Sequence, residues 1–391
     1  MLDESKAMDP TVGRPKWRDF VAGGLYHSGV LRAVDKLSRH YELAPDGSGR
    51  LSATRRVRGP KFAILCYHRI GTEGIPLFNG LPPEIFELQM RFLRKRYAVV
   101  SLDEMCREME RPTKDGNFVA VTFDDGYRDL YLHALPALEK YQIPATVFLP
   151  VSCIETGQVP WYDKIFLALK VFSGNKLELF LGGHRTFRID SYTTRMQAAA
   201  QINSYLRTIP DLARQEFCRD FEKQIALPSE ELANRMLTWD QVRAMSREGV
   251  IFGSHTMTHP AVSQLTEIEL EKEIGDSKTM LEERLGNPVR HFAFPFGKTE
   301  DCGTAASNLL IRYGYRSAAK TLEGINVPGD NPYELRRVQF GEERSLSMFA
   351  FRLGRLFLSS RLEHPSINMV GASSLHEARS RTDEQLVKKD A

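Results

Sequence analysis

The sequence predicts an α/β fold in which parallel strands alternate with helices. Residues 62–66 and 118–123 are short apolar runs, rich in β-branched and aromatic side chains, and such runs form buried strands. Each run leads into polar residues, His68 in the first case and Asp124 with Asp125 in the second. Helical patterns separate these strands from the next ones, and this alternation is typical of a parallel sheet covered by helices.

The composition fits a globular protein and excludes some classes of partner. The chain has 391 residues, of which 42% are hydrophobic and 26% charged, enough for one large domain with insertions or for two domains. Its 53 basic and 50 acidic residues give a formal charge of +3, too small a bias to indicate nucleic acid as a partner. The five cysteines form no CxxC pair and their number is odd, which favours a reducing compartment over a disulfide framework.

In residues 1–60 we predict a tail, an amphipathic helix from Trp17 to Leu43 and a linker. The tail is polar and contains no signal peptide, and no run in the chain approaches 18 apolar residues, so we expect a cytoplasmic protein without a transmembrane segment. The helix is basic, as is a second amphipathic segment from Met348 to Leu362. Such helices pack on their own protein or lie on an anionic membrane, and the second alternative predicts a peripheral membrane contact.

The main domain is predicted over residues 61–345, with an insertion at about 152–236. Before the insertion the expected elements are helices at 83–96, from Ser101, and at 127–141 with an interruption near Pro136, and strands at 97–100, 118–123 and 145–149. Within the insertion we expect a helix opening at Trp161, a hairpin of 176–181 with 184–189, and helices at 196–206 and 211–225. The insertion breaks the alternation and is a candidate lid.

After the insertion the alternation of strands and helices resumes. The expected elements are helices at 238–249, 266–285 and 305–313 and strands at 250–253, from 291, at 315–319 and at 334–340. Residues 346–391 are predicted to form a C-terminal helix and a disordered tail.

Asp124 and Asp125 are the first candidates for chemistry. Neighbouring carboxylates repel each other, and burying both without a positive charge is costly. A metal ion would resolve the repulsion, because one carboxylate can hold the cation while the other stays free for proton transfer. The alternative is an ordinary Asp-Asp-Gly turn after a core strand.

His255 and His259 are the second candidates. On a helix their spacing would place both on one face, but Pro260 disfavours helical backbone at His259, so we expect them on a loop after a strand. Two histidines and one carboxylate leave an open position for water, which is the ligand arrangement of a catalytic zinc site. His68 also ends a strand, although a lone histidine in such a place is more often structural.

Three motifs in the main domain resemble those of the polysaccharide deacetylases, also called NodB-homology proteins or family 4 carbohydrate esterases. They occur in the family's order and are Thr122-Phe123-Asp124-Asp125-Gly126, Ser254-His255-Thr256-Met257-Thr258-His259-Pro260 and Phe292-Ala293-Phe294-Pro295-Phe296-Gly297. In addition, Tyr67-His68-Arg69-Ile70 resembles the opening strand of the subgroup that deacetylates exopolysaccharides such as poly-N-acetylglucosamine. The resemblance covers roughly residues 61–150 and 236–340.

The resemblance implies a distorted (β/α) barrel of about seven parallel strands with its site at the carboxyl ends of the strands. It implies that Asp125, His255 and His259 hold one divalent metal ion, zinc first, with cobalt or nickel as alternatives. Asp124 would be the general base that takes a proton from the attacking water.

In the third motif the resemblance assigns Pro295 and Phe296 to the substrate and oxyanion side of the site. The backbone N–H of Phe296 would hold the oxyanion. Many members have tyrosine at that position, but a backbone donor survives the loss of a hydroxyl.

The chain departs from the family pattern at the arginine that braces the base. Many members carry it two residues before the proline of the third motif, where this chain has Ala293. The brace is then either supplied from elsewhere or absent, and Arg336 and Arg337 in the predicted closing strand are the candidates.

A second departure concerns the proton for the leaving amine. Many members use a late histidine, but the only histidines after Pro295 are His364 and His376 in the C-terminal tail. Among the histidines of the barrel stretch, only His68 follows a strand without being assigned to the metal. We therefore predict that His68 is the general acid, and the alternative is that it orients a ligand or packs beneath the site.

Together these features predict a metal-dependent amidohydrolase acting on linear amides, which removes acetyl groups from N-acetylated sugars of a glycan, glycolipid or glycan precursor. The alternatives are an O-acetyl carbohydrate esterase and a catalytically weak glycan-binding or assembly protein on the same fold. A base beside a complete ligand set argues against the last, because binding alone needs no base. The sugar, its linkage, the native metal and the oligomeric state are left open.

Overall fold

The computed structural model of the protein describes residues 41–45, 51–55, 59–71, 80–225, 227–228, 232–303, 305–341, 343 and 345–359. Its centre is an eight-stranded sheet in the order β11-β10-β9-β6-β5-β3-β12, with β4 paired to β5 beside this path. The strands are β3 (Pro60–Tyr67), β4 (Ala98–Val99), β5 (Gly116–Phe123), β6 (Ala145–Leu149), β9 (Ile251–Ser254), β10 (His291–Ala293), β11 (Ser317–Ala319) and β12 (Val338–Gln339).

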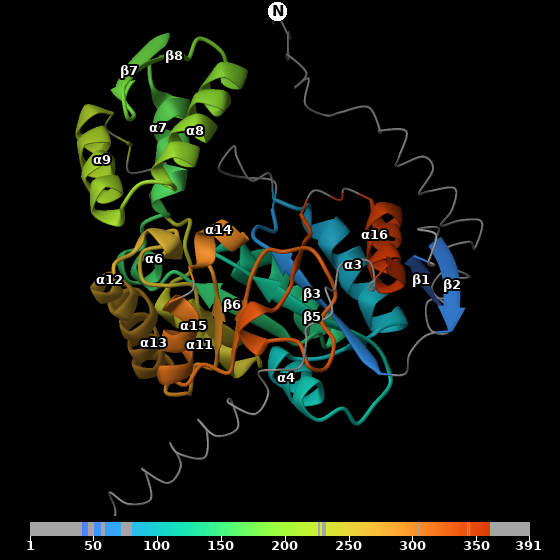
Figure 1. The fold of residues 1–391 in the computed structure, drawn as a ribbon. Coiled ribbons are helices and arrows are strands. Elements are labelled where there is room, and N and C mark those ends of the chain that lie inside the picture. The colour runs from blue at the N-terminus through green and yellow to red at the C-terminus, as the bar shows by residue number, and fades with distance from the viewer. Residues whose placement is uncertain are drawn as a thin grey trace, which may run out of the picture.

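All neighbouring strands of this sheet are parallel, and the seven on the main path curl into a half-barrel with helices outside (Figure 1). This confirms the predicted α/β fold with a distorted barrel of about seven parallel strands. Between successive strands of the sheet the chain runs from the carboxyl end of one strand back to the amino end of the next, as parallel pairing requires.

Side chains alternate between the two faces of the long strands β3 and β5. These strands are in register from Pro60 opposite Gly116 to Tyr67 opposite Phe123. Phe62, Ile64, Phe118 and Ala120 share one face and form one buried cluster with side chains of α4 (Leu102–Glu110). Continued by the period of two, this inner face carries Cys66, His68, Thr122 and Asp124 at the carboxyl ends.

Helices surround the sheet as expected, and two of the helical stretches contain a π turn. The helices besides α4 are α3 (Pro83–Arg96), α5 (Leu135–Tyr141), α11 (Trp239–Arg247), α12 (Glu267–Glu271), α13 (Ser277–Leu285), α14 (Thr299–Cys302) and α15 (Ala305–Arg312). A π turn, η1 (Leu130–Ala134), precedes α5, and a second, η3 (Lys272–Asp276), joins α12 to α13. The second π turn interrupts the stretch 266–285, for which the sequence predicted one continuous helix.

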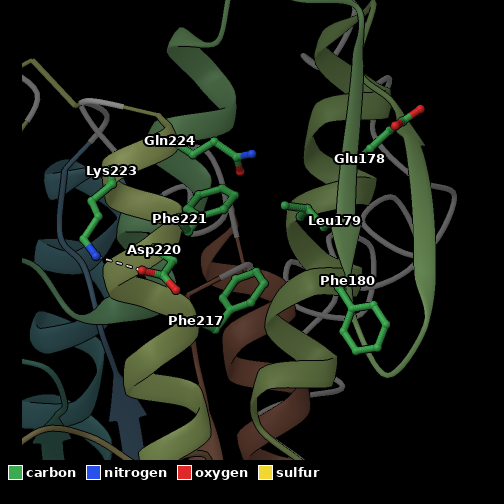
Figure 2. A pocket seen from close by; sticks show the side chains of 8 residues that line it. All are labelled: Glu178, Leu179, Phe180, Phe217, Asp220, Phe221, Lys223 and Gln224. Carbon is green, nitrogen blue, oxygen red and sulfur yellow. Dashed lines mark hydrogen bonds and ion pairs between the residues drawn. The ribbon is translucent and has the colours of Figure 1, made fainter.

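The insertion forms a separate lobe beyond the carboxyl edge of the sheet (Figure 1). The first helix of the insertion, α6 (Val151–Thr156), stays with the body of the molecule (Figure 1). The lobe contains α7 (Trp161–Val171), the hairpin β7 (Lys176–Phe180) with β8 (His184–Arg188), α8 (Tyr192–Leu206) and α9 (Asp211–Gln224). The predicted hairpin and helices are therefore present. A pocket of about 440 Å³ lies between β7 and α9, lined in part by Leu179, Phe180, Phe217 and Phe221, and it contains none of the predicted site residues (Figure 2).

The last segment of the barrel closes the gap between its two edge strands. Leu335 bridges to Ala319 of β11, and three residues later Val338 pairs with Leu65 of β3. Because the chain crosses from one edge to the other, it cannot form the single strand predicted over 334–340. It forms instead the 3₁₀ turn η4 (Pro332–Glu334) and the two-residue β12.

The N-terminal prediction is wrong where the structure describes it. β1 (Tyr41–Pro45) pairs antiparallel with β2 (Leu51–Arg55), where a helix end and a linker were expected. Pairing between two strands overrides the local helical pattern, because tertiary contacts outweigh propensity. The rest of the predicted amphipathic helix lies outside the described residues.

The C-terminal helix is confirmed as α16 (Leu346–Ser359), next to β1 and α3 (Figure 1). This helix carries an apolar face for which a membrane contact was one of the two predictions. Four of its side chains are buried within the protein: Phe349, Leu353, Leu356 and Phe357. The alternative of packing on its own protein therefore holds for this segment. Among the described residues, no helix combines the length and the apolar character needed to cross a membrane.

Candidate active site

The two adjacent aspartates stand at the carboxyl end of β5 and are both 2% exposed. Asp124 continues the ladder, because its N–H donates to the Tyr67 carbonyl at 2.9 Å. At Asp125 the backbone turns sharply into a left-handed conformation, with φ of 71°. Beyond this turn the two carboxylates have different closest partners, Arg337 for Asp124 and the two histidines for Asp125.

His255 and His259 lie on the loop after β9, as predicted. The loop holds two further left-handed residues, Thr256 with φ of 68° and His259 with φ of 61°. Non-glycine residues adopt this conformation only when surrounding contacts enforce it, and such positions concentrate at functional sites. The conformation brings the two imidazole rings to a centroid distance of 4.7 Å.

Asp125 and the two histidines converge on one point. Asp125 Oδ1 lies 3.4 Å from His259 Nε2 and 3.7 Å from His255 Nε2, and one ligand atom from each residue lies within 4.8 Å of the others. The structure thus brings together the three residues that the resemblance assigned to the metal.

The chemistry of these three groups fits a divalent cation. Asp125 Oδ1 is buried and has no hydrogen-bonding partner, so it has an open acceptor site. His255 Nδ1 donates to the Ala293 carbonyl at 2.7 Å, which leaves the lone pair on Nε2 available. Burial disfavours the imidazolium and, despite the nearby Asp124 carboxylate, lowers the pKa of His255 to about 4, so the ring is in the neutral form that binds metals.

Arg337 braces Asp124. Its guanidinium donates to both carboxylate oxygens, from Nη1 to Oδ1 at 2.7 Å and from Nη2 to Oδ2 at 2.8 Å, and its Nε donates to the Lys320 carbonyl at 3.1 Å. Burial alone would raise the pKa of Asp124, but the charge and hydrogen bonds of Arg337, with His255, bring it well below the usual value. The family's bracing arginine is absent at Ala293, and the closing segment supplies a substitute. Of the two predicted candidates, it is Arg337 and not Arg336 that pairs with Asp124.

His68 stands beside the base. A ring nitrogen of His68, the Cys66 sulfur and an Asp124 oxygen lie within 4.8 Å of one another. The Cys66 thiol donates to Asp124 Oδ2 at 3.5 Å. Burial raises the pKa of Cys66 well above its ordinary value, so the sulfur stays a neutral donor rather than a thiolate ligand. Half-buried His68 is the member of this group best placed to exchange protons with a substrate.

Phe296 forms the opposite wall of the site. Its backbone is left-handed, with φ of 59°, and its ring meets the His259 ring edge-on at a centroid distance of 4.9 Å. Thr321 Oγ1 donates to its carbonyl oxygen, which fixes the loop after Pro295. The peptide N–H predicted to serve as oxyanion donor thus belongs to a restrained loop beside His259.

The insertion completes this wall. For the residues concerned, the sequence predicted only that a helix opens at Trp161. The Trp161 indole donates to the His259 carbonyl at 3.0 Å, and the Tyr162 ring packs on the His259 ring at 4.9 Å. The guanidinium of Arg207, after α8, stands over the Phe296 ring at 5.5 Å. The sequence feature that could have indicated this contact is the aromatic pair Trp161-Tyr162. The pair follows Pro160 directly and begins α7.

Asp163, next along α7, is a third buried carboxyl and interacts electrostatically with Asp125. It is fully buried, and one of its oxygens accepts a hydrogen bond from the Tyr127 hydroxyl at 2.7 Å. Burial, and then the charge of Asp125, raise its pKa to about 7. Such a value is uncommon outside functional sites, and only the tertiary structure reveals it.

The model of the polysaccharide deacetylase family matches residues 111–317. This span is more than half of the chain and contains Asp124, Asp125, His255, His259 and Phe296. The chain belongs to the polysaccharide deacetylase family. His68 and Arg337 lie outside the matched span, so their assignment rests on the geometry above.

Individual relatives agree with the family. The YxkH protein of Bacillus subtilis (strain 168), whose name assigns it provisionally to the polysaccharide deacetylases, is 22% identical over 295 residues, 74% of this chain and 75% of its own. The deacetylase PplD of Streptococcus pyogenes has a TM-score of 0.51 at 21% identity and covers 76% of this chain and 99% of its own. IcaB from Ammonifex degensii has a TM-score of 0.49 at 20% identity over 78% of this chain and 99% of its own. At 21% identity, the likeness to PplD shows a shared fold.

Proposed function

We propose that this polysaccharide deacetylase hydrolyses the acetamido group of N-acetylated sugars in a glycan, glycolipid or glycan precursor, releasing acetate and an amine. Family membership supports deacetylase activity on a glycan. The finer proposal is carried by one observation: of two adjacent buried carboxylates, Asp124 is bound bidentately by Arg337, whereas Asp125 turns an unpartnered oxygen toward two histidines.

We assign Asp125, His255 and His259 to one divalent metal ion, with zinc first and cobalt or nickel as alternatives. When bound, such an ion polarises the acetyl carbonyl and makes a water molecule acidic near neutral pH. Asp124 accepts the proton of that water as it attacks. Arg337 keeps Asp124 ionised and fixes the direction of its oxygens, which favours proton transfer through orientation rather than through basicity.

His68 and Phe296 act on the other two reacting groups. The carbonyl oxygen becomes negative as the tetrahedral intermediate forms, and the Phe296 N–H donates to it. The amine is a poor leaving group until it is protonated, and His68 supplies that proton. Each of the two developing charges is thus met by a group fixed in advance.

The proposal is tested by measuring acetate release from a chitooligosaccharide and from a lipid-linked N-acetylated sugar, with zinc-loaded or cobalt-loaded protein. Wild-type protein should release acetate from at least one, and Asp124→Asn should release little from either. Release only from O-acetylated sugars would replace this proposal by the esterase alternative. If metal-loaded protein released acetate from neither the N-acetylated nor the O-acetylated substrates, the result would contradict the proposed hydrolysis and favour a binding role.

A further inference from the structure

Glu273 holds the loop that carries both histidines. One of its carboxylate oxygens accepts the backbone N–H groups of Met257 at 2.7 Å and Thr258 at 2.9 Å, and the other accepts the Thr258 hydroxyl at 2.7 Å. These two residues lie between His255 and His259 in the sequence. A single side chain therefore satisfies three donors in the middle of the metal-binding loop.

The loop needs this restraint because its conformation is unfavourable in isolation. Thr256 and His259 are both left-handed, and neither is glycine. Smaller contacts within the loop help, since Ser254 Oγ accepts the Thr256 N–H at 3.1 Å and Thr256 Oγ1 accepts the His259 N–H at 3.0 Å. Start-of-helix residues hold the loop through its carbonyls, since the Ser152 N–H and hydroxyl donate to the Met257 carbonyl at 2.9 and 2.6 Å. Glu273 holds the same central pair from the other side, by accepting its N–H groups.

The π turn η3 presents Glu273 to the loop. A π turn shifts the direction of the side chains that follow it within an otherwise regular helix, and such turns are frequent at functional sites. Here the turn also contains Gly275, packed so closely on Tyr313 that an added Cβ would lie 2.4 Å from its ring. The turn thus packs tightly against α15 and the residue that follows it, so the backbone that carries Glu273 is held in place. The Glu273 side chain is 7% exposed.

We infer that Glu273 is a positioning residue that sets the affinity of the Asp125–His255–His259 site for its metal ion. The inference rests on the proposed function, because it takes those three residues as the ligands. Without Glu273 the half-buried amides of Met257 and Thr258 lose their acceptor, and the loop relaxes toward conformations in which the two imidazoles no longer converge. Removing a group that orients metal ligands typically weakens binding about 10-fold to 100-fold.

The chain offers a matched control in Glu282 on α13, the helix that continues from η3. Its Oε1 accepts a backbone N–H, from Val289 at 2.8 Å, and also pairs with Lys278. Like Glu273 it is a helical glutamate that holds a neighbouring backbone segment, but that segment contains no proposed ligand. Its loss should lower stability without affecting the metal.

The experiment measures the zinc dissociation constant by competition with a chelator, together with the melting temperature of the metal-free form. We expect Glu273→Ala to raise the dissociation constant 10-fold to 100-fold, Glu273→Gln to raise it less, and Glu282→Ala to change it less than twofold. Glutamine keeps one acceptor oxygen, so it serves as the test where the alanine variant does not fold.

An unchanged dissociation constant in folded Glu273→Ala or Glu273→Gln would overturn the inference, as would an equal rise in Glu282→Ala. If wild-type protein itself binds no stoichiometric zinc, the proposed ligand set has failed instead. Because the readout is metal binding and not turnover, the two failures are distinguishable.

Discussion

Two buried histidine–carboxylate clusters occupy opposite ends of the same sheet, on the adjacent strands β9 and β10. His255 follows β9 at the carboxyl end, and His291 begins β10 at the amino end. Both rings are buried, and burial lowers both pKa values, so both imidazoles are neutral. Burial and a nearby acid therefore do not distinguish an active site from a structural cluster.

The clusters differ in how the charge of their carboxylates is compensated. At the amino end, Asp103 lies 3.3 Å from His291, 3.6 Å from Arg290 and 3.9 Å from Arg316, while the Ser317 hydroxyl lies 2.9 Å from the other His291 nitrogen. Two of these partners of Asp103, Arg290 and Arg316, are cationic. At the carboxyl end, Arg337 is engaged by Asp124, and Asp125 keeps an acceptor without a partner. Among the described residues, Asp103 thus has two arginines to compensate its charge, whereas the ion pairs of Asp125 involve only histidines. This difference in charge indicates that the carboxyl end is the cluster that fits a cation.

The largest expected effect separates the two carboxylates of the proposed site. Asp124→Asn keeps the size of the side chain but cannot accept the proton of water, so kcat should fall about 10²-fold to 10⁴-fold. Metal affinity should change little, because Asp124 is not a proposed ligand. Full activity in this variant would remove Asp124 from the mechanism.

His68 is tested by changing the leaving group. His68→Ala should slow amide hydrolysis by about 10²-fold but slow an activated acetyl ester much less, because a phenolate leaves without a proton. The two substrates are compared under single-turnover conditions with the same metal loading. Equal losses on both would return His68 to a structural role.

Arg337 is expected to contribute less than either of these, through position and pH. In Arg337→Met, burial of Asp124 persists while the opposing guanidinium is lost, so the pKa of Asp124 rises. Because Asp124 works only when deprotonated, the acid limb of the kcat/KM profile should move to higher pH, with about a 10-fold to 10²-fold loss at neutral pH.

Arg336→Met is the matched control for Arg337, because Arg336 is the adjacent arginine of the same segment, whereas the bidentate pair with Asp124 is made by Arg337. That variant should keep the acid limb of the wild-type protein. An identical shift in both variants would show that the closing segment acts as a whole rather than through the bidentate pair.

The sequence-based prediction succeeded where chemistry follows local pattern. The alternation along β3 and β5 places His68 and Asp124 on the inner face, and Pro260 correctly excluded a helix at the histidine pair. The pattern could not choose between Arg336 and Arg337, because the chain there crosses from one edge strand to another and follows no strand period. Glu273 was missed for a similar reason, since its link to Thr258 depends on a π turn that no residue pattern marks.

Amphipathic patterns proved ambiguous in a different way. The apolar residues of α16 fit a membrane surface and a protein core equally well, because both offer an apolar face to the same helix period. The structure places them in the core. Asp103 and His291 likewise carry no local signal, because the partners are 188 positions apart and meet only when the barrel forms.

The smallest expected functional effect lies at the amino end. His291→Ala should lower the free energy of unfolding by about 1–3 kcal/mol, because Ser317 and Asp103 lose a buried partner. Metal affinity and kcat should stay at the wild-type values. Chemical denaturation and acetate release measure the two quantities, and a loss of metal together with stability would erase the contrast between the clusters.

The metal content of purified protein tests the central claim most directly. After reloading with zinc, cobalt or nickel and removal of the excess, elemental analysis should find one ion per chain in wild-type protein and in Asp103→Asn, and none in Asp125→Ala. Wild-type protein without a stoichiometric ion under all three loadings, or Asp125→Ala with a full one, would contradict the assignment of the carboxyl-end cluster as a metal centre.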